Sequence, residues 1–284
     1  MTQSPTRFCE SSALSCLSFS VFTKPWRLPL PELARQVAGW GFDGVELPVR
    51  PGFQVLPENV QRDLPVAVRV LADHGLRIFS VAGPTDEATM SACAECGIPV
   101  IRVMAPIGED GYLASVERLQ REYDALLPLL EKYGVTVGVQ NHCDRMVNNA
   151  MGLRHLLWKY DVRRFGAVWD AAHNALNGEE PEMAIDIIWS HLIMVNLKNA
   201  FWRRLNGPEA EVAQWRPWWT SGRQGLASWP RVAAELKRRD YRGVICLTAE
   251  YSDEASVERL IAADLKFARS LLAHGDMERE PKGG

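Results

Sequence analysis

Four stretches in the second half of the chain each end an apolar run with a cluster of polar side chains. They span residues 135–142, 165–173, 193–199 and 244–250, and the clusters contain Gln140, His142, Asp170, His173, Asn196, Lys198 and Glu250. Carboxylates, amides, imidazoles and amines are the groups that bind metals and move protons. When parallel strands close into a barrel, their ends meet at one mouth, where the active sites of barrel enzymes lie. The sequence therefore predicts an enzyme.

Such an arrangement requires a regular series of strands and helices, and the chain has one. Short β-like runs alternate with longer stretches of helical apolar spacing. The predicted strands are 14–19, 44–47, 77–81, 100–104, 135–139, 165–169, 193–197 and 244–248, and the predicted helices are 31–40, 60–73, 86–96, 113–133, 150–159, 181–189, 228–239 and 257–273. Eight strand–helix units indicate an α/β fold, a single (β/α)₈ TIM barrel.

Size and composition narrow the class of protein. The 284 residues, 47% of them hydrophobic, suit one domain over 1–284, with flexible ends expected at 1–12 and 276–284. A net charge of −3 without blocks of like charge argues against a nucleic-acid partner, and no apolar run is long enough for a membrane span. The N-terminus lacks the apolar core of a secretion signal, and the six cysteines lack framework spacing, so we expect a cytoplasmic protein.

Cys93 and Cys96 form a C-x-x-C pair near the end of a predicted helix. Residues three apart share one helix face, and no second pair follows at the spacing of a zinc site. We expect buried free cysteines here, with a metal or redox role as the alternative.

Two long connections, 48–58 and 200–225, follow predicted strands and should lie over the mouth. The second contains four tryptophans and four arginines, among them Trp202 and Arg203. Tryptophan faces pack on the C–H surfaces of sugars, and arginines donate to hydroxyl or carboxylate groups, so the loop could cover a sugar or polyol. The same residues are enriched in subunit interfaces, so a homo-oligomer is the other interpretation.

The motifs, taken in order, resemble those of the xylose isomerase-like TIM barrel superfamily of sugar isomerases and epimerases. The resemblance covers nearly the whole chain and is carried by residues 41–47, 139–142, 170–173, 195–199 and 249–250. The family holds one divalent metal with Glu, Asp, His and Glu at the ends of strands five to eight. Asp170 and Glu250 match this set, whereas Gln140 and Asn196 replace the first Glu and the His. The resemblance implies a weakly held Mn²⁺ or Mg²⁺ on Gln140, Asp170, Asn196 and Glu250, and an all-oxygen set also suits Ca²⁺.

The resemblance also implies roles for the neighbouring residues. His142 and His173 match positions that contact substrate, and with Glu250 they are the candidate acid and base groups. Lys198 is expected to donate to a substrate oxygen or to neutralise Asp170. Glu46 and Arg102, at the ends of strands two and four, are expected to bind substrate or to pair with each other.

The family resemblance implies a metal-dependent isomerase or epimerase that acts on the carbon next to a carbonyl of a sugar, keto-sugar or cyclitol. In the family, the strand-five carboxylate is one of two bases, and Gln140 cannot accept its proton. A keto-sugar or inosose dehydratase or lyase, which needs one base and one acid, is therefore the alternative. A catalytically silent barrel that binds a sugar or a partner protein is the third interpretation.

Overall fold

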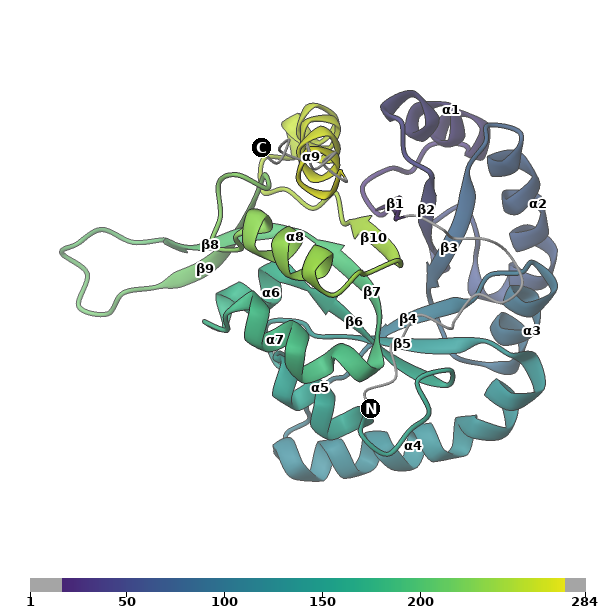
Figure 1. Ribbon diagram of the computed structural model, residues 1–284, viewed down its shortest axis with the longest axis horizontal. Coiled ribbons are helices and arrows are strands. Elements are labelled where there is room, and N and C mark those ends of the chain that lie inside the picture. Colours follow the sequence, from purple (N-terminus) through teal and green to yellow (C-terminus); the bar gives the residue numbers. More distant parts are fainter. Residues whose placement is uncertain (1–16, 274–284) are drawn as a thin grey trace, which may run out of the picture.

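The computed structural model describes residues 17–273, whose centre is a closed barrel of eight parallel strands (Figure 1). Around the barrel the strands follow the order β1-β10-β7-β6-β5-β4-β3-β2. Their bounds are β1 Ser18–Phe22, β2 Gly44–Pro48, β3 Arg77–Ala82, β4 Val100–Met104, β5 Thr136–Gln140, β6 Phe165–Asp170, β7 Leu192–Leu197 and β10 Val244–Leu247. The predicted single (β/α)₈ TIM barrel is confirmed.

Helices cover the outside of the barrel and return the chain from each strand to the next (Figure 1). They are α1 Leu30–Trp40, α2 Val60–Ala72, α3 Glu87–Glu95, α4 Tyr112–Tyr133, α5 Ala150–Leu157, α6 Ala171–Leu176, α7 Pro181–Ile188, α8 Trp229–Arg238 and α9 Val257–Leu272, with short 3₁₀ turns at Pro57–Asn59, Trp189–His191 and Glu254–Ser256. Most bounds lie within two residues of the predicted ones. The short α6 was not predicted, because it begins directly at the end of β6 without an intervening loop.

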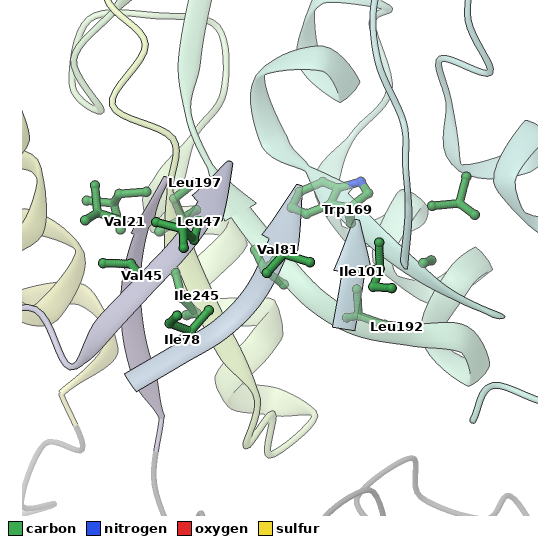
Figure 2. Packing of buried hydrophobic residues seen from close by; sticks show 14 of the residues in the cluster. Val21, Val45, Leu47, Ile78, Val81, Ile101, Trp169, Leu192, Leu197 and Ile245 are labelled. Atoms are coloured by element: carbon green, nitrogen blue, oxygen red, sulfur yellow. The ribbon is translucent and has the colours of Figure 1, made fainter. Parts of the chain in front are cut away.

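Side chains alternate along each strand, so one set packs against the helices and the other fills the barrel. Val45, Leu47 and Val81 belong to the large outer core (Figure 2). The inner set is separate and smaller: Phe22, Ala82, Val168, Met194 and Cys246. Polar residues in the middle of β2 and β4 and at or near the ends of β5, β6 and β7 continue this inner set into a buried polar layer.

Two parts of the prediction were wrong in detail. The first strand runs over Ser18–Phe22, not 14–19, and residues 14–16 lie outside the described residues. Residues 200–225 are not an irregular loop, because β8 Asn199–Arg204 and β9 Trp215–Thr220 pair as an antiparallel hairpin. This hairpin projects well beyond the barrel and its helices (Figure 1). The terminal stretches 1–12 and 276–284 also fall outside the described residues.

Four cysteines of the described part of the chain, Cys93, Cys96, Cys143 and Cys246, are free. Burial raises the pKa of Cys93 to about 12, so its thiol stays protonated. Cys93 is thus a buried free cysteine as predicted, whereas Cys96 is free but only half-buried. Within residues 17–273, no helix is both long and apolar enough to cross a membrane.

Candidate active site at the barrel mouth

A pocket of about 1340 Å³ opens at the carboxyl ends of the strands. Its walls come from residues 24–27 after β1, Cys143 and Asp144 after β5, residues 216–219 of β9, and residues 248–259 after β10. Of the four predicted metal ligands, Glu250 alone lines this pocket, and 32% of its side chain is exposed. Gln140, Asp170 and Asn196 are buried beneath it.

The buried layer is a continuous chain of polar contacts across the barrel interior. Ser80 donates to Glu46 Oε1 at 3.1 Å, and Arg102 Nε donates to the same oxygen at 2.7 Å. Arg102 also donates to Gln140 Oε1 at 2.5 Å, and Gln140 Nε2 donates to Asp170 Oδ2 at 2.9 Å. Glu46 and Arg102 therefore pair with each other, which was one of the two alternatives for them, and neither lines the pocket.

The orientation of the Gln140 amide follows from its two neighbours. A guanidinium has donors and no acceptor, so the amide atom that faces Arg102 must be the carbonyl oxygen. The amide NH₂ then points at Asp170, whose carboxylate accepts it. Gln140 thus connects a cation to an anion and has no free carbonyl oxygen directed towards Asp170.

Asp170 ends β6 and caps the N-terminus of α6. Its Oδ1 accepts from the backbone N–H groups of Ala172 and His173 at 3.0 and 3.1 Å, an arrangement typical of N-caps. Asn141 holds the backbone of Asp170 on both sides, accepting from its N–H and donating to its carbonyl. Burial raises the pKa of Asp170, while Lys198 and the N–H of His173 act in the opposite direction.

Lys198 follows β7, and its side chain is only 3% exposed. Its Nζ donates to Glu250 Oε2 at 2.8 Å and lies 3.6 Å from the centre of the Trp219 ring. Burial acts to raise the pKa of Glu250, but Lys198 and Lys24 outweigh it and hold that pKa below its ordinary value. Glu250 is therefore an ionised carboxylate at neutral pH, paired with a covered ammonium.

His173 is fully buried, and its ring lies between Lys198 and the loop after β5. Its Nδ1 accepts from the backbone N–H of Cys143 at 3.0 Å, so the neutral ring carries its proton on Nε2. Burial, with Lys198 acting in the same direction, lowers the pKa of His173 well below its ordinary value, which keeps the ring neutral. Lys198 Nζ lies 3.2 Å from this Nε2. Because Nε2 carries a proton, it cannot accept a hydrogen bond from the Lys198 ammonium.

His142, Cys143 and His173 form a second cluster of metal-binding residue types, with one potential ligand atom from each within 4.8 Å of the others. In two of these three residues, the potential ligand atom already accepts a hydrogen bond or carries a proton. Nδ1 of His173 accepts the Cys143 N–H, and burial raises the pKa of the Cys143 thiol to about 12. The ring of His142 lies 4.0 Å from that of His173, centre to centre, at an interplanar angle of 36°. His142 donates through Nδ1 to the Cys143 carbonyl, which leaves its Nε2 as the acceptor when the ring is neutral.

The backbone at the end of β10 is strained in a way that directs Glu250. Ala249 has φ of 52°, in the left-handed region that residues with a side chain rarely adopt. Such conformations persist where the surrounding structure imposes them, and they are frequent at functional sites. The turn sends the chain from β10 to Glu250 at the pocket wall.

The four predicted metal ligands do not fit a divalent ion as they are arranged. Gln140 presents its NH₂ group to Asp170, Asp170 accepts on both of its oxygens, and Glu250 is paired with an ammonium. Only Asn196 is free, since both of its amide atoms are buried without a partner among the described residues. The donor chemistry that Mg²⁺ and Mn²⁺ prefer requires several oxygens directed at one point. Metal binding by these four residues therefore stays a prediction. Their arrangement in the structure does not support it.

The hairpin residues in the pocket wall differ from those predicted. Trp202 is 44% exposed, bonds to the Leu176 carbonyl, and does not line the pocket, and Arg203 stacks on Trp218 outside it. The return strand β9 supplies Trp218 and Trp219 instead. Ser252 fixes Trp219 over Lys198 by accepting its backbone N–H at 2.9 Å.

Sequence reasoning missed Lys24 and Trp219. Lys24 lies 3.9 Å from Glu250 Oε1, and its position after β1 was hidden because the first strand was placed too early. Trp219 was counted only as one of several loop tryptophans. A signal for a strand existed in the tryptophans and the threonine of residues 215–220, residue types that are enriched in strands.

Residues 34–271 match the family described as xylose isomerase-like TIM barrel. This match covers most of the chain, so the chain belongs to that family. No curated protein matches the chain in sequence.

Solved structures with the same barrel include enzymes of carbohydrate chemistry. D-psicose 3-epimerase from Clostridium cellulolyticum H10 is 15% identical, with a TM-score of 0.67 over 90% of this chain and 99% of that one. The 3-keto-D-glucoside 4-epimerase from E. coli is 12% identical, with a TM-score of 0.66 over 89% and 99%. A probable 3-DHS dehydratase of petrobactin synthesis from Bacillus anthracis is 16% identical, with a TM-score of 0.65 over 88% and 97%. At these identities the likeness shows the shared fold.

Proposed function

We propose that the chain is an enzyme that removes the proton from the carbon next to a carbonyl of a sugar, keto-sugar or cyclitol. The observation that carries this proposal is the ionised carboxylate of Glu250 in the wall of the mouth pocket, 2.8 Å from the covered ammonium of Lys198. A carboxylate can take the proton, and a nearby positive charge stabilises the negative charge that develops on the carbonyl oxygen. Both groups lie where barrel enzymes bind their substrates.

The pocket wall suits a polyol. Trp218 and Trp219 offer aromatic faces, and Lys24, Arg27 and Arg216 offer donors for hydroxyl groups. Its volume of about 1340 Å³ exceeds the roughly 300–1,000 Å³ of most small-ligand pockets, so a single sugar would fill only part of it. The epimerases among the structural neighbours agree with a sugar-like substrate.

Two outcomes are open to the carbanion-like species that proton removal creates. In an isomerase or epimerase, the proton returns, and in a dehydratase or lyase, a leaving group departs from the next carbon. Gln140 favours the second outcome, because its amide cannot act as a second base and is held between Arg102 and Asp170. His142, whose Nε2 is available, is the candidate partner acid or base. Elimination is therefore the second candidate function.

Solvent deuterium exchange tests the proposal. A panel of ketoses, keto-sugars and inososes is incubated with the protein in D₂O, and mass spectrometry measures deuterium at the carbon next to the carbonyl. We expect exchange with at least one compound, and Glu250→Gln should slow it by about 10²–10⁴-fold, the usual contribution of a general base. Glu117→Gln is the matched control, since it removes the same charge from an exposed position on α4.

The reaction products then distinguish elimination from isomerisation or epimerisation. A new conjugated carbonyl absorbance indicates elimination, whereas an epimer or isomer without such absorbance indicates return of the proton. Saturable quenching of tryptophan fluorescence by a polyol, without exchange or product from any compound, would identify a silent sugar-binding barrel instead. A cytoplasmic location and a homo-oligomer stay predictions.

A further inference from the structure

Lys198 lies beside Glu250, one of the four positions that the family resemblance assigns to the metal. Its Nζ contacts Glu250, which follows β10, and His173, which follows β6, while Lys198 itself follows β7. Trp219 covers it at 3.6 Å from the ring centre. A buried ammonium is costly unless anions or aromatic faces compensate it, and here both do. The fold therefore holds a fixed positive charge at this point.

The carboxylates of Glu250, Glu46 and Asp170 at this end of the barrel already have cationic or hydrogen-bonding partners. Glu250 is paired with Lys198, and Glu46 is paired with Arg102. Asp170 accepts from two backbone N–H groups and from the Gln140 amide. A divalent ion would have to displace the ammonium from Glu250 and turn the Gln140 amide away from Arg102. Both changes would leave a buried charge without its present partner, which is strongly unfavourable.

From this we infer that the Lys198 ammonium takes the electrostatic role of the family's metal, and that the chain works without a divalent ion. The inference rests on the proposed function, because it assigns the positive charge that faces the substrate's carbonyl oxygen. An ammonium has three donors. Glu250 accepts one of them, and His173 accepts none because its Nε2 carries a proton, so donors remain on an ammonium that lies directly behind Glu250 and Trp219 of the pocket wall. Lys198 is therefore the electrophilic group, and Glu250 is the base beside it.

Metal binding tests the inference without any substrate. Mn²⁺ is titrated into the chelator-treated full-length protein by calorimetry, with electron paramagnetic resonance measuring free Mn²⁺. We expect no binding to the wild-type protein below about 1 mM, a concentration at which even weak oxygen sites bind. Lys198→Met keeps the side-chain length, removes the charge, and frees Glu250 from its ion pair with the ammonium, so it should bind Mn²⁺ roughly tenfold or more tightly than the wild type.

Two matched variants test whether the tighter Mn²⁺ binding of Lys198→Met arises at this site. Lys237→Met removes one positive charge from an exposed position on α8 and should bind no more Mn²⁺ than the wild type. Adding Asp170→Asn to Lys198→Met should abolish the gain in Mn²⁺ affinity, because it removes a carboxylate from the same site. Circular dichroism checks that each variant is folded.

Wild-type protein that binds one Mn²⁺ with a dissociation constant of tens of micromolar, and loses it on Asp170→Asn, would overturn the inference. So would a folded Lys198→Met that gains no affinity for Mn²⁺. The wild-type titration decides the matter even where the variant does not fold. Deuterium exchange is a separate measurement, so a metal-binding enzyme that still exchanges the proton would refute the role of Lys198 and leave the proposed function standing.

Discussion

Gln140 shows how one amide changes the chemistry available at the end of a strand. Its carbonyl oxygen accepts from Arg102 and its NH₂ group donates to Asp170, so it joins two buried groups of opposite charge. A carboxylate at this position could accept from Arg102 but could not donate to Asp170. The amide therefore stabilises the buried layer while it removes a proton acceptor.

Replacing Gln140 with Glu should destabilise the protein. The new carboxylate would lie beside buried Asp170, and the resulting repulsion, together with the lost hydrogen bond, should cost about 1–3 kcal/mol of unfolding free energy at neutral pH. Urea unfolding followed by circular dichroism measures the difference. Gln140→Met, which is neutral and of similar length, separates loss of the hydrogen bonds from the added charge. A Gln140→Glu protein as stable as the wild type would show that the amide does not bridge these residues.

At the scale of elements, the base of the β8–β9 hairpin is attached to α9 by one buried carboxylate. Asp264 of α9 accepts from the backbone N–H of Gly222 and from the Tyr251 hydroxyl at 2.8 Å. These contacts hold the segment after β9 against the segment after β10, and residues of β9 itself and of the segment after β10 line the pocket. Burial raises the pKa of Asp264 to about 6 from its ordinary 3.8.

This shift predicts a pH dependence of stability. The folded state binds the Asp264 proton more tightly than the unfolded state, so the stabilisation is fully present below pH 3.8 and is lost as the pH rises through about 6. The free energy of unfolding of the wild type relative to Asp264→Asn should therefore fall by up to about 3 kcal/mol over that interval. Urea unfolding at a series of pH values measures it.

Tyr251→Phe provides the comparison for Asp264. The Tyr251 hydroxyl bond opposes the rise in the Asp264 pKa, so its removal should move the pH-dependent interval upward. A relative stability that does not change with pH in either pair would mean that folding does not raise the pKa of Asp264.

At the scale of the whole molecule, the barrel and the hairpin arm make different contributions. The barrel strands and helices share one large core, whereas the hairpin tip, residues 205–214, projects away from it (Figure 1). The tip exposes apolar side chains, including Val212 at 71%. The base of the same hairpin supplies Trp219 to the pocket.

Replacing residues 205–214 with a short Asn-Gly turn should leave the barrel intact. Because the tip has little contact with the core, we expect a change of less than about 1 kcal/mol in unfolding free energy. Deuterium exchange should also persist, since Trp219 and Glu250 are retained. Analytical ultracentrifugation of both proteins tests the interface interpretation: a fall in mass to that of one chain would show that the tip joins subunits. Loss of exchange at unchanged mass would instead place the tip in substrate binding.

The sequence by itself determined the barrel, most element bounds and the residues that gather at the mouth. This was possible because apolar periodicity reports which face of each strand or helix is buried, and parallel strands bring their ends together. Gln140, Asp170, Asn196, Lys198 and Glu250 all follow from that rule. The family resemblance, which the match over residues 34–271 confirms, rests on the same local motifs.

Only the tertiary structure decided what these residues do to one another. Periodicity gives no distances between strands, so it could not show that Arg102 fixes the Gln140 amide or that Lys198 pairs with Glu250. It also could not place Trp219 over Lys198, because a long-range hairpin contact with Ser252 sets that position. Pairing between buried charges depends on geometry across the barrel, and for that reason the sequence could not show that the Lys198 ammonium lies against Glu250, one of the predicted metal ligands.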